Sequence, residues 1–247
     1  MADGHWRSDR ASRNVSARPL LQDRRLPVVL SWSGGKDSAL ALWRLRQNPA
    51  FDVRALLTTI TEGYDRISMH AIRESILTRQ ASEIGVPVVR VPIPPDCPDA
   101  LYQQRMSEAL DDPRIADVLH FAFGDLFLED VRAYRESQLA TAGKRGVFPL
   151  WGEDTAELAR SFIKDGFRAI LTCVDPRRLD ASFAGRSFDE SLLRDLPEGV
   201  DPCGENGEFH TLVFEGPIFP RPIRVEVGEV VRRAGFVFCD VLTKSEE

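Results

Sequence analysis

The sequence has no long apolar run and no segment that looks like a secretory signal. No stretch approaches the ~20 consecutive apolar residues that a membrane-spanning helix needs, so no membrane partner is expected. The first 25 residues are rich in arginine and contain no apolar core, while Asp3, Asp9 and Asp23 interrupt the acid-poor pattern of a transit peptide. We therefore expect residues 1–25 to form a flexible tail and the protein to be cytoplasmic.

The sequence is also poor in metal-binding patterns and in net positive charge. Its four cysteines form no Cys-x-x-Cys pair and its four histidines form no pair at metal-ligand spacing, so a structural zinc site is not expected. Lysine and arginine number 32 against 38 aspartate and glutamate residues, which gives a net charge of -6. This balance disfavours a broad nucleic-acid surface, and we expect no nucleic-acid partner.

Short apolar, β-branched runs alternate with longer segments of helical period through the first 150 residues. This pattern predicts strands at 28–30, 53–60, 87–93, 118–123 and 147–150, and helices at 37–46, 69–84, 99–110 and 128–142. Strands that are joined by helices should run parallel, with right-handed crossovers. The sequence therefore predicts an α/β fold built on a doubly wound, Rossmann-like, five-stranded parallel sheet.

The pattern changes after Trp151. A helix at 155–165 and a strand at 169–174 precede a polar region, 175–207, and strands are predicted at 211–214, 223–227 and 236–242. We interpret this part as a second, smaller α/β domain. The predicted organisation is a tail at 1–25, a first domain at 26–151 and a second domain at 152–247.

The first predicted strand ends in the polar, glycine-containing stretch SWSGGKDS, residues 31–38. Ligands of doubly wound sheets bind at the carboxyl ends of the strands. Two glycines let backbone amides converge on one anion, the following helix adds its positive end, and the serine and lysine side chains add donors. The stretch suits a phosphate or pyrophosphate, although a tight turn with an Asp or Ser cap is the simpler alternative. The candidate binding residues are Ser33, Gly34, Gly35, Lys36, Asp37 and Ser38.

Residues 33–38 resemble the SGGxDS pyrophosphate loop of the ATP pyrophosphatase superfamily, typified by GMP synthetase, asparagine synthetase and tRNA lysidine synthetase. Those enzymes cleave ATP between the α and β phosphates, adenylate a substrate oxygen and let a nucleophile displace AMP. The resemblance implies an adenine nucleotide α-hydrolase-like fold with ATP and Mg²⁺ as cofactors. It also implies that Lys36 stabilises the leaving pyrophosphate and that Asp37 meets the metal.

Residues 26–219 are similar to the diphthine–ammonia ligase family, also called the ATP-binding domain 4 family. The similarity is carried by SGGKDS, by His70 in SMHAIRESILTRQASEIGVPV, by Gly124-Asp125 and by GENGEFHT at 204–211. It implies amidation of a carboxylate acceptor, with ammonium as the nitrogen source. The chain departs from the diphthamide-forming pattern at Asn206 and His210, where Gly and Glu are usual. It resembles a separate branch, for which a small-metabolite acceptor, such as a cobalamin-related carboxylate, is an open alternative.

Two carboxylates and an imidazole lie close together in the GENGEFHT segment. Glu205, Glu208 and His210 could bind ammonium, accept its proton or hold Mg²⁺, and we take them with Lys36 as the candidate catalytic residues. An attacking amine must be neutral, whereas ammonium dominates at pH 7, so a nearby base is chemically useful. An acidic, solvated turn is the alternative interpretation.

Four further residues are candidates for the nucleotide pocket: Thr58, His70, Gly124 and Asp125. Thr58 ends the second strand, but its β propensity explains it equally well. His70 could lie beside the adenine or simply begin a helix. Asp125 follows the fourth strand and should face the cleft.

Several interpretations remain open at this point. Arg177, Arg178 and Arg186 could bind an anionic acceptor, although a solvated charged loop is simpler. We interpret Cys203 as a bystander. An adenylating tRNA-modifying enzyme and a non-catalytic ATP-binding sensor are the alternatives to an amide ligase, and a homodimer is also an open possibility.

Overall fold

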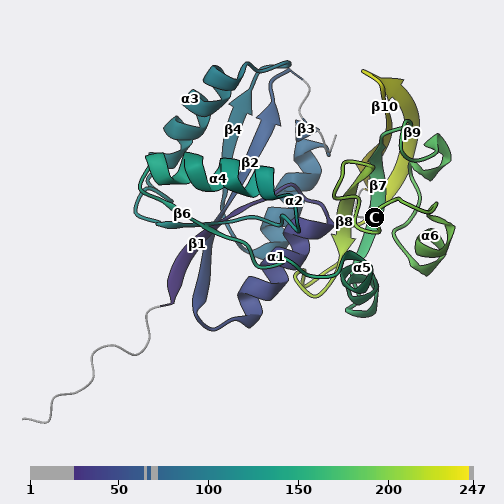
Figure 1. The fold of residues 1–247 in the computed structure, drawn as a ribbon, viewed down its shortest axis with the longest axis horizontal. Coiled ribbons are helices and arrows are strands. Elements are labelled where there is room, and N and C mark those ends of the chain that lie inside the picture. Colours follow the sequence, from purple (N-terminus) through teal and green to yellow (C-terminus); the bar gives the residue numbers. More distant parts are fainter. Residues whose placement is uncertain (1–24, 64–65, 68–71, 245–247) are drawn as a thin grey trace, which may run out of the picture.

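Two β-sheets lie side by side in the protein (Figure 1). The computed structural model describes residues 25–63, 66–67 and 72–244. His70, which we predicted to contact the nucleotide, and nearly all of the predicted tail lie outside these residues. Within the described chain, no helix is long and apolar enough to cross a membrane.

The first sheet has five parallel strands in the order β4-β2-β1-β5-β6. Its strands are β1 (Leu26–Ser31), β2 (Phe51–Thr61), β4 (Val88–Ile93), β5 (His120–Ala122) and β6 (Arg145–Val147). A short strand, β3 (Arg66–Ile67), pairs antiparallel with the end of β2. The predicted doubly wound, five-stranded parallel sheet is therefore confirmed. Its strand order reverses between β1 and β5, where such folds bind their ligands.

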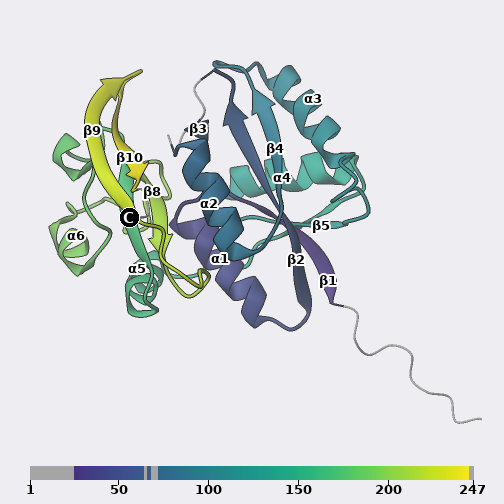
Figure 2. The same cartoon turned by 180° about the vertical axis from the view of Figure 1, so that it is seen from behind.

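Helices cover both faces of this sheet (Figures 1 and 2). Leu30 of β1 packs in one cluster with α1 (Lys36–Gln47) and α2 (Glu74–Ile84), while its neighbour Val29 packs in a second cluster with Leu139 of α4 (Glu129–Thr141). The helix α3 (Asp99–Leu110) packs on the second cluster through partly buried residues. Alternate residues of a strand point to opposite faces, which explains this division.

The second sheet is antiparallel, in the order β8-β7-β10-β9. Its strands are β7 (Arg168–Val174), β8 (Phe209–Glu215), β9 (Val225–Arg233) and β10 (Phe236–Thr243), and its helices are α5 (Thr155–Lys164), a 3₁₀ turn (Ala181–Phe183) and α6 (Glu190–Asp195). Helix α6 lies on the side away from the first sheet (Figure 2). The second part of the fold is thus a smaller α/β unit, as predicted.

Several predicted elements differ from the structure, and the described part of the helix predicted at 69–84 begins at Glu74. The strand predicted at 147–150 ends at Val147, because Pro149 has no amide to donate to a ladder, and β6 instead begins at Arg145. The strand predicted at 223–227 begins at Val225 and runs on to Arg233 as an edge strand, whose polar sequence hid its length. The region 175–207 also contains α6, a short helix that Asp189 caps by accepting a hydrogen bond from the Leu192 amide (2.9 Å).

The two sheets share one apolar core. A single buried cluster joins residues under the first sheet, such as Leu40 and Leu56, with residues of the second unit, such as Leu171 and Leu212. Strand β8 contacts the loop after β1 directly, because the Val213 amide donates a hydrogen bond to the Gly34 carbonyl (2.9 Å). The second unit therefore packs directly against the loop that follows β1. The division into two domains near Gly152 stays a prediction.

Candidate active site

The loop between β1 and α1 presents the beginning of a helix to a polar cavity. Gly34 has φ +77°, a left-handed conformation that favours glycine, and Gly35 occupies the N-cap position of α1 without a side-chain cap. The amide of Lys36 donates to Thr211 Oγ1 (3.0 Å). Gly35 offers no side chain to the next amides of this turn, and the backbone amide that the Asp37 carboxylate binds is its own. The Asp or Ser cap of the simpler interpretation is therefore not what holds this helix.

The two loop serines bind within the loop itself. Ser33 Oγ lies 3.2 Å from Ser38 Oγ and accepts from the Gly35 amide (3.3 Å), while Ser38 Oγ donates to the Gly35 carbonyl (3.0 Å). These bonds fix the loop in one conformation. A bound anion would compete for the same hydroxyl groups.

Gln80 of α2 binds the loop between β1 and α1 through buried hydrogen bonds. Its side chain is fully buried and makes three hydrogen bonds: Nε2 donates to the carbonyls of Gly34 (3.0 Å) and Val213 (2.7 Å), and Oε1 accepts from Trp32 Nε1 (3.1 Å). The sequence analysis missed this residue. Its signal is a polar side chain at helical spacing between Ile76 and Ile84 on the buried face of α2.

The end of β5 packs closely against the first turn of α1. A Cβ atom on Gly124 would lie 2.8 Å from the carbonyl carbon and oxygen of Asp37, so only glycine fits there. The next residue, Asp125, binds Arg135 of α4 through two hydrogen bonds (2.7 and 3.2 Å). Arg135 also covers the Phe123 ring, 4.5 Å from its centroid. Gly124 and Asp125 thus both lie beside the loop, and Arg135 is a cavity residue that sequence reasoning did not select.

These elements enclose a cavity of about 280 Å³ with the GENGEFHT segment. Nine of the predicted site residues line it: Ser33, Gly35, Lys36, Asp37, Ser38, Gly124, Asp125, Glu205 and His210. Thr211 and Arg135 line it as well. The two motifs on which the sequence analysis depended therefore meet at one cavity, although they belong to different sheets.

Lys36 and Asp37 form a tight ion pair on the cavity wall. Lys36 Nζ lies 2.7 and 2.8 Å from the two carboxylate oxygens of Asp37, and the Lys36 side chain is 3% exposed. Burial by itself lowers the pKa of Lys36, but Asp37 outweighs it and the pKa is raised above its ordinary value. Lys36 is therefore charged at neutral pH, as a group that binds a phosphate should be.

Glu205 has a pKa shifted toward neutrality. Burial raises the pKa of Glu205 to about 7, against the opposing hydrogen bond from the Leu126 amide (2.8 Å). Its own amide donates to Asp201 Oδ2 (2.7 Å), which fixes the backbone at this position. A carboxyl group with such a pKa can accept or release a proton at physiological pH.

Glu208 has different surroundings. Its side chain is 2% exposed, and Oε1 accepts from the Asp201 amide (3.2 Å) and from Asn206 Nδ2 (3.1 Å). Glu208 does not line the polar cavity, and its Oε2 is buried with no hydrogen-bond partner among the described residues. These contacts close the loop at 201–208, and Asn206 helps to hold it through its hydrogen bond to Glu208. The predicted catalytic role of Glu208 remains a prediction.

Thr58 ties two strands together instead of facing the cavity. Its hydroxyl is buried and donates to the Trp32 carbonyl (2.8 Å). The neighbouring Thr59 lines a second, mostly apolar cavity of about 660 Å³ that is bounded by β2, β5, α3 and α4. This apolar cavity shares four lining residues with the polar one: Ser31, Ser33, Phe123 and Arg135. The two cavities therefore adjoin.

None of the remaining candidates that the structure describes lines the polar cavity, although Cys203 is the neighbour of Gly204, which does. Arg177 pairs with Asp175 (2.8 Å) and Arg186 pairs with Asp195 (2.6 Å), which supports the interpretation of charged loop residues. Cys203 is buried, and burial raises the pKa of its thiol to about 12. A thiol in this state is a poor nucleophile, as expected of a bystander.

The described residues contain no group of three or more His, Cys, Asp or Glu side chains that could hold a metal ion unaided. Mg²⁺ commonly binds through one or two carboxylates together with the phosphates of a nucleotide. Asp37 lines the cavity and offers a carboxylate, so the residues present fit a metal that arrives with phosphate.

The fold and the site together define a doubly wound α/β protein with a polar cavity at the point where the strand order reverses. Two family models match the chain: the diphthamide synthase N-terminal domain over residues 26–136 and the diphthamide synthase C-terminal domain over residues 154–245. The chain therefore belongs to the diphthine–ammonia ligase family.

Curated relatives agree with this assignment. The chain is 30% identical over 107 residues to the diphthine–ammonia ligase of Schizosaccharomyces pombe, 32% identical over 97 residues to that of Homo sapiens, and 34% identical over 97 residues to that of Danio rerio. The matched part covers 37–42% of this chain and 18%, 36% and 38% of the three relatives. The chain thus matches well under half the length of each.

Proposed function

We propose that this protein is an ATP-dependent amide ligase. A carboxylate oxygen of the acceptor attacks the α phosphorus of ATP, the bond to the β phosphate breaks, and pyrophosphate leaves. Ammonia then attacks the acyl carbon of the acyl adenylate, and the bond to AMP breaks. The products are an amide, AMP and pyrophosphate.

The observation that carries this proposal is that one polar cavity is lined both by the loop at 33–38 and by the segment at 204–211. The loop brings a charged lysine and the positive end of a helix, which suit the leaving pyrophosphate. The other segment brings Glu205, with a pKa of about 7. A phosphate site and a proton acceptor in one cavity are the two parts that the reaction needs.

Each residue has a specific task in this mechanism. Lys36 and the first-turn amides of α1 stabilise the charge that develops on pyrophosphate. Glu205 accepts the proton that the nitrogen loses when it forms the amide bond. When bound, Mg²⁺ would neutralise part of the phosphate charge, and Asp37 would hold it. The adjoining apolar cavity gives the base and ribose of ATP a place beside the phosphate site.

We propose first the chemical class of the acceptor and then its kind. The relatives are named for diphthine and ammonia, and they support a carboxylate acceptor and ammonia as the nitrogen source. Asn206 and His210 depart from the diphthamide-forming pattern that the resemblance implies, and this departure supports an acceptor other than diphthine. A small-metabolite carboxylate, such as a cobalamin-related one, is the candidate that we favour.

The experiment that tests the function supplies ¹⁵N-ammonium, ATP and Mg²⁺ to the purified protein, with small-molecule and macromolecular extracts of the source cell added separately. We expect AMP, together with ¹⁵N in a new amide, only with the small-molecule extract. Incorporation of ¹⁵N into protein would assign a protein acceptor. If RNase treatment of the macromolecular extract abolished the AMP or the label, a tRNA-modifying enzyme would be favoured. Tight ATP binding without any turnover would instead favour a sensor.

A further inference from the structure

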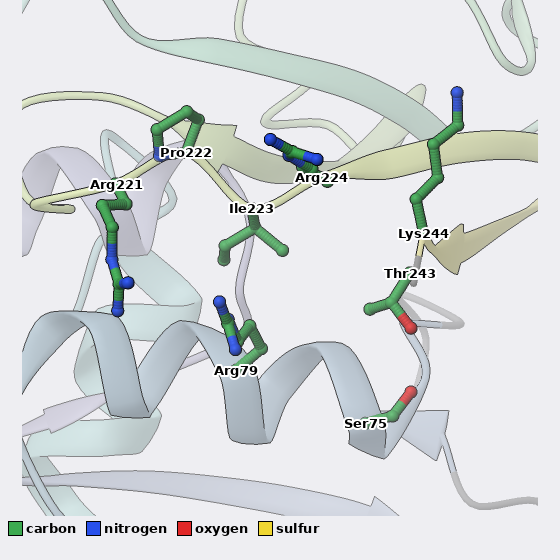
Figure 3. Close-up of a pocket in the computed structure, with 8 residues that line it drawn as sticks. All are labelled: Ser75, Arg79, Arg221, Pro222, Ile223, Arg224, Thr243 and Lys244. Carbon is green, nitrogen blue, oxygen red and sulfur yellow. The ribbon is translucent and has the colours of Figure 1, made fainter. Parts of the chain in front are cut away.

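A second charged cavity lies on the side of α2 that faces the second sheet. It has a volume of about 680 Å³ and lies between α2 and two C-terminal segments, 221–224 and 243–244. Figure 3 shows Ser75 and Arg79 rising from α2, with the C-terminal residues opposite them. Among the described residues it shares no lining residue with the polar or the apolar cavity described above. It is therefore a separate site formed across the two halves of the protein.

Its lining is strongly basic. Four of its eight lining residues carry positive charge: Arg79, Arg221, Arg224 and Lys244. The opposing acid is Glu83, whose Oε1 lies 3.4 Å from Arg79 Nε and 3.2 Å from Arg221 Nη2. Arg224 and Lys244 have no ion pair with any other residue that the structure describes. The cavity thus carries an excess of positive charge in a chain whose net charge is -6.

Two acids near the cavity are engaged elsewhere, and a third, the exposed Glu226 of β9, does not line it. Glu74, at the start of α2, pairs with Arg90 (2.8 Å), and Asp240 of β10 pairs with Arg73. Neither Glu74 nor Asp240 is among the residues that line the cavity. The positive charge in the cavity is therefore available to an anionic ligand.

The remaining lining residues add two hydroxyl groups and two apolar side chains. The hydroxyl groups of Ser75 and Thr243 point toward each other across the cavity, while Arg79 and Arg221 lie at its other end (Figure 3). Pro222 and Ile223 are the only apolar side chains of the lining within the described chain. The four cationic side chains and two hydroxyl groups favour a ligand with negative charge and acceptor oxygens. Guanidinium groups and hydroxyls are the donors that bind phosphate oxygens in proteins.

We propose that this cavity is a binding site for a small ligand that carries two or more phosphate groups. Its volume lies within the ~300–1,000 Å³ of typical small-molecule sites, and it is larger than a single phosphate requires. Such a ligand would join α2 to the C-terminal segments and so hold the two halves together. The site does not depend on the proposed ligase reaction.

The test measures binding of inorganic tripolyphosphate by titration calorimetry, without divalent metal. The cavity variant is Arg224→Gln/Lys244→Gln, chosen because neither residue has a described ion pair whose loss would leave an acid unpaired. The matched control is Arg145→Gln/Arg168→Gln, which removes the same charge from two exposed positions that line none of the three cavities. A third protein, Lys36→Gln, reports binding at the loop after β1.

We expect tripolyphosphate to bind the wild type, the matched control and Lys36→Gln at a common site with the same Kd, and to bind the cavity variant at least tenfold more weakly. Equal affinity in the cavity variant and the control would overturn the proposal, as would binding lost only in Lys36→Gln. The proposal would also be overturned if the cavity variant weakened the binding of a single-stranded RNA but left the binding of tripolyphosphate unchanged. That result would assign the surface to nucleic acid.

Discussion

Lys36 and Glu205 line the same cavity, and each has a protonation state set by its surroundings. Asp37 keeps Lys36 charged despite burial, whereas burial keeps Glu205 protonated up to a pH of about 7. Sequence reasoning selected both residues from their motifs. It could not separate Glu205 from Glu208, because only the fold shows that one carboxyl group lines the cavity and that the other binds the Asp201 amide.

The pKa of Glu205 predicts how activity depends on pH. At a constant concentration of neutral ammonia, we expect the wild-type rate to rise with an apparent pKa near 7, as Glu205 loses its proton and becomes a base. Glu205→Gln should lower kcat by about 10²-fold or more and should remove this rise. Initial rates between pH 5.5 and 8.5 measure both effects. An unchanged profile in the variant would show that another group titrates.

The same pKa predicts a change in stability. The carboxyl group binds its proton more tightly in the folded than in the unfolded protein, so its contribution to stability falls as pH rises from the unfolded value of about 4.5 to about 7. Glu205→Gln should therefore become more stable relative to the wild type over that range and constant above it. Urea unfolding at pH 5, 6 and 8 measures the difference. A difference that does not vary with pH would contradict the assigned pKa.

At the scale of elements, the positions of the parallel strands followed from their β-branched runs, because strands buried on both faces leave a continuous apolar signal. The edge strand β9 and the short helix α6 left no such signal, since both lie at the surface with polar sequences. The three hydrogen bonds by which Gln80 joins α2 to β8 and to the loop after β1, here called the Gln80 clamp, could not be predicted either. Gln80 is a polar residue on an apolar helix face, and only the structure shows its three hydrogen-bond partners.

The Gln80 clamp predicts a large effect from a single substitution. Gln80→Met keeps the side-chain volume but leaves the Val213 carbonyl and the Trp32 indole without a buried partner, while the Gly34 carbonyl keeps its bond from the Val213 amide. We expect the free energy of unfolding to fall by about 2–4 kcal/mol, since each unpaired buried group costs ~1–3 kcal/mol. The control is Gln104→Met, because Gln104 is exposed on α3. Equal urea midpoints for the two variants would contradict the clamp.

At the scale of the whole molecule, the apolar core runs without a break from the first sheet into the second. Strand β8 binds the loop at Gly34, and Gln80 binds both. The sequence predicted two domains from a change in its pattern after Trp151. It could not show that they share a core, because the contacts join residues far apart along the chain.

This continuous core predicts that the two halves unfold together. We expect a single calorimetric transition with equal calorimetric and van't Hoff enthalpies, since neither sheet keeps its buried surface without the other. Scanning calorimetry of the full chain measures this. Two resolved transitions, or an enthalpy ratio well above one, would show that the halves are independent domains.

The central claim is that the loop at 33–38 and the segment at 204–211 form one site that cleaves ATP between the α and β phosphates. Its most direct test follows α-labelled ATP with ammonium, Mg²⁺ and the acceptor extract, in the wild type and in Lys36→Gln. The account predicts labelled AMP from the wild type and a rate lowered about 10²–10³-fold in the variant, as when one donor to a developing anion is removed. Labelled ADP in place of AMP would contradict the account.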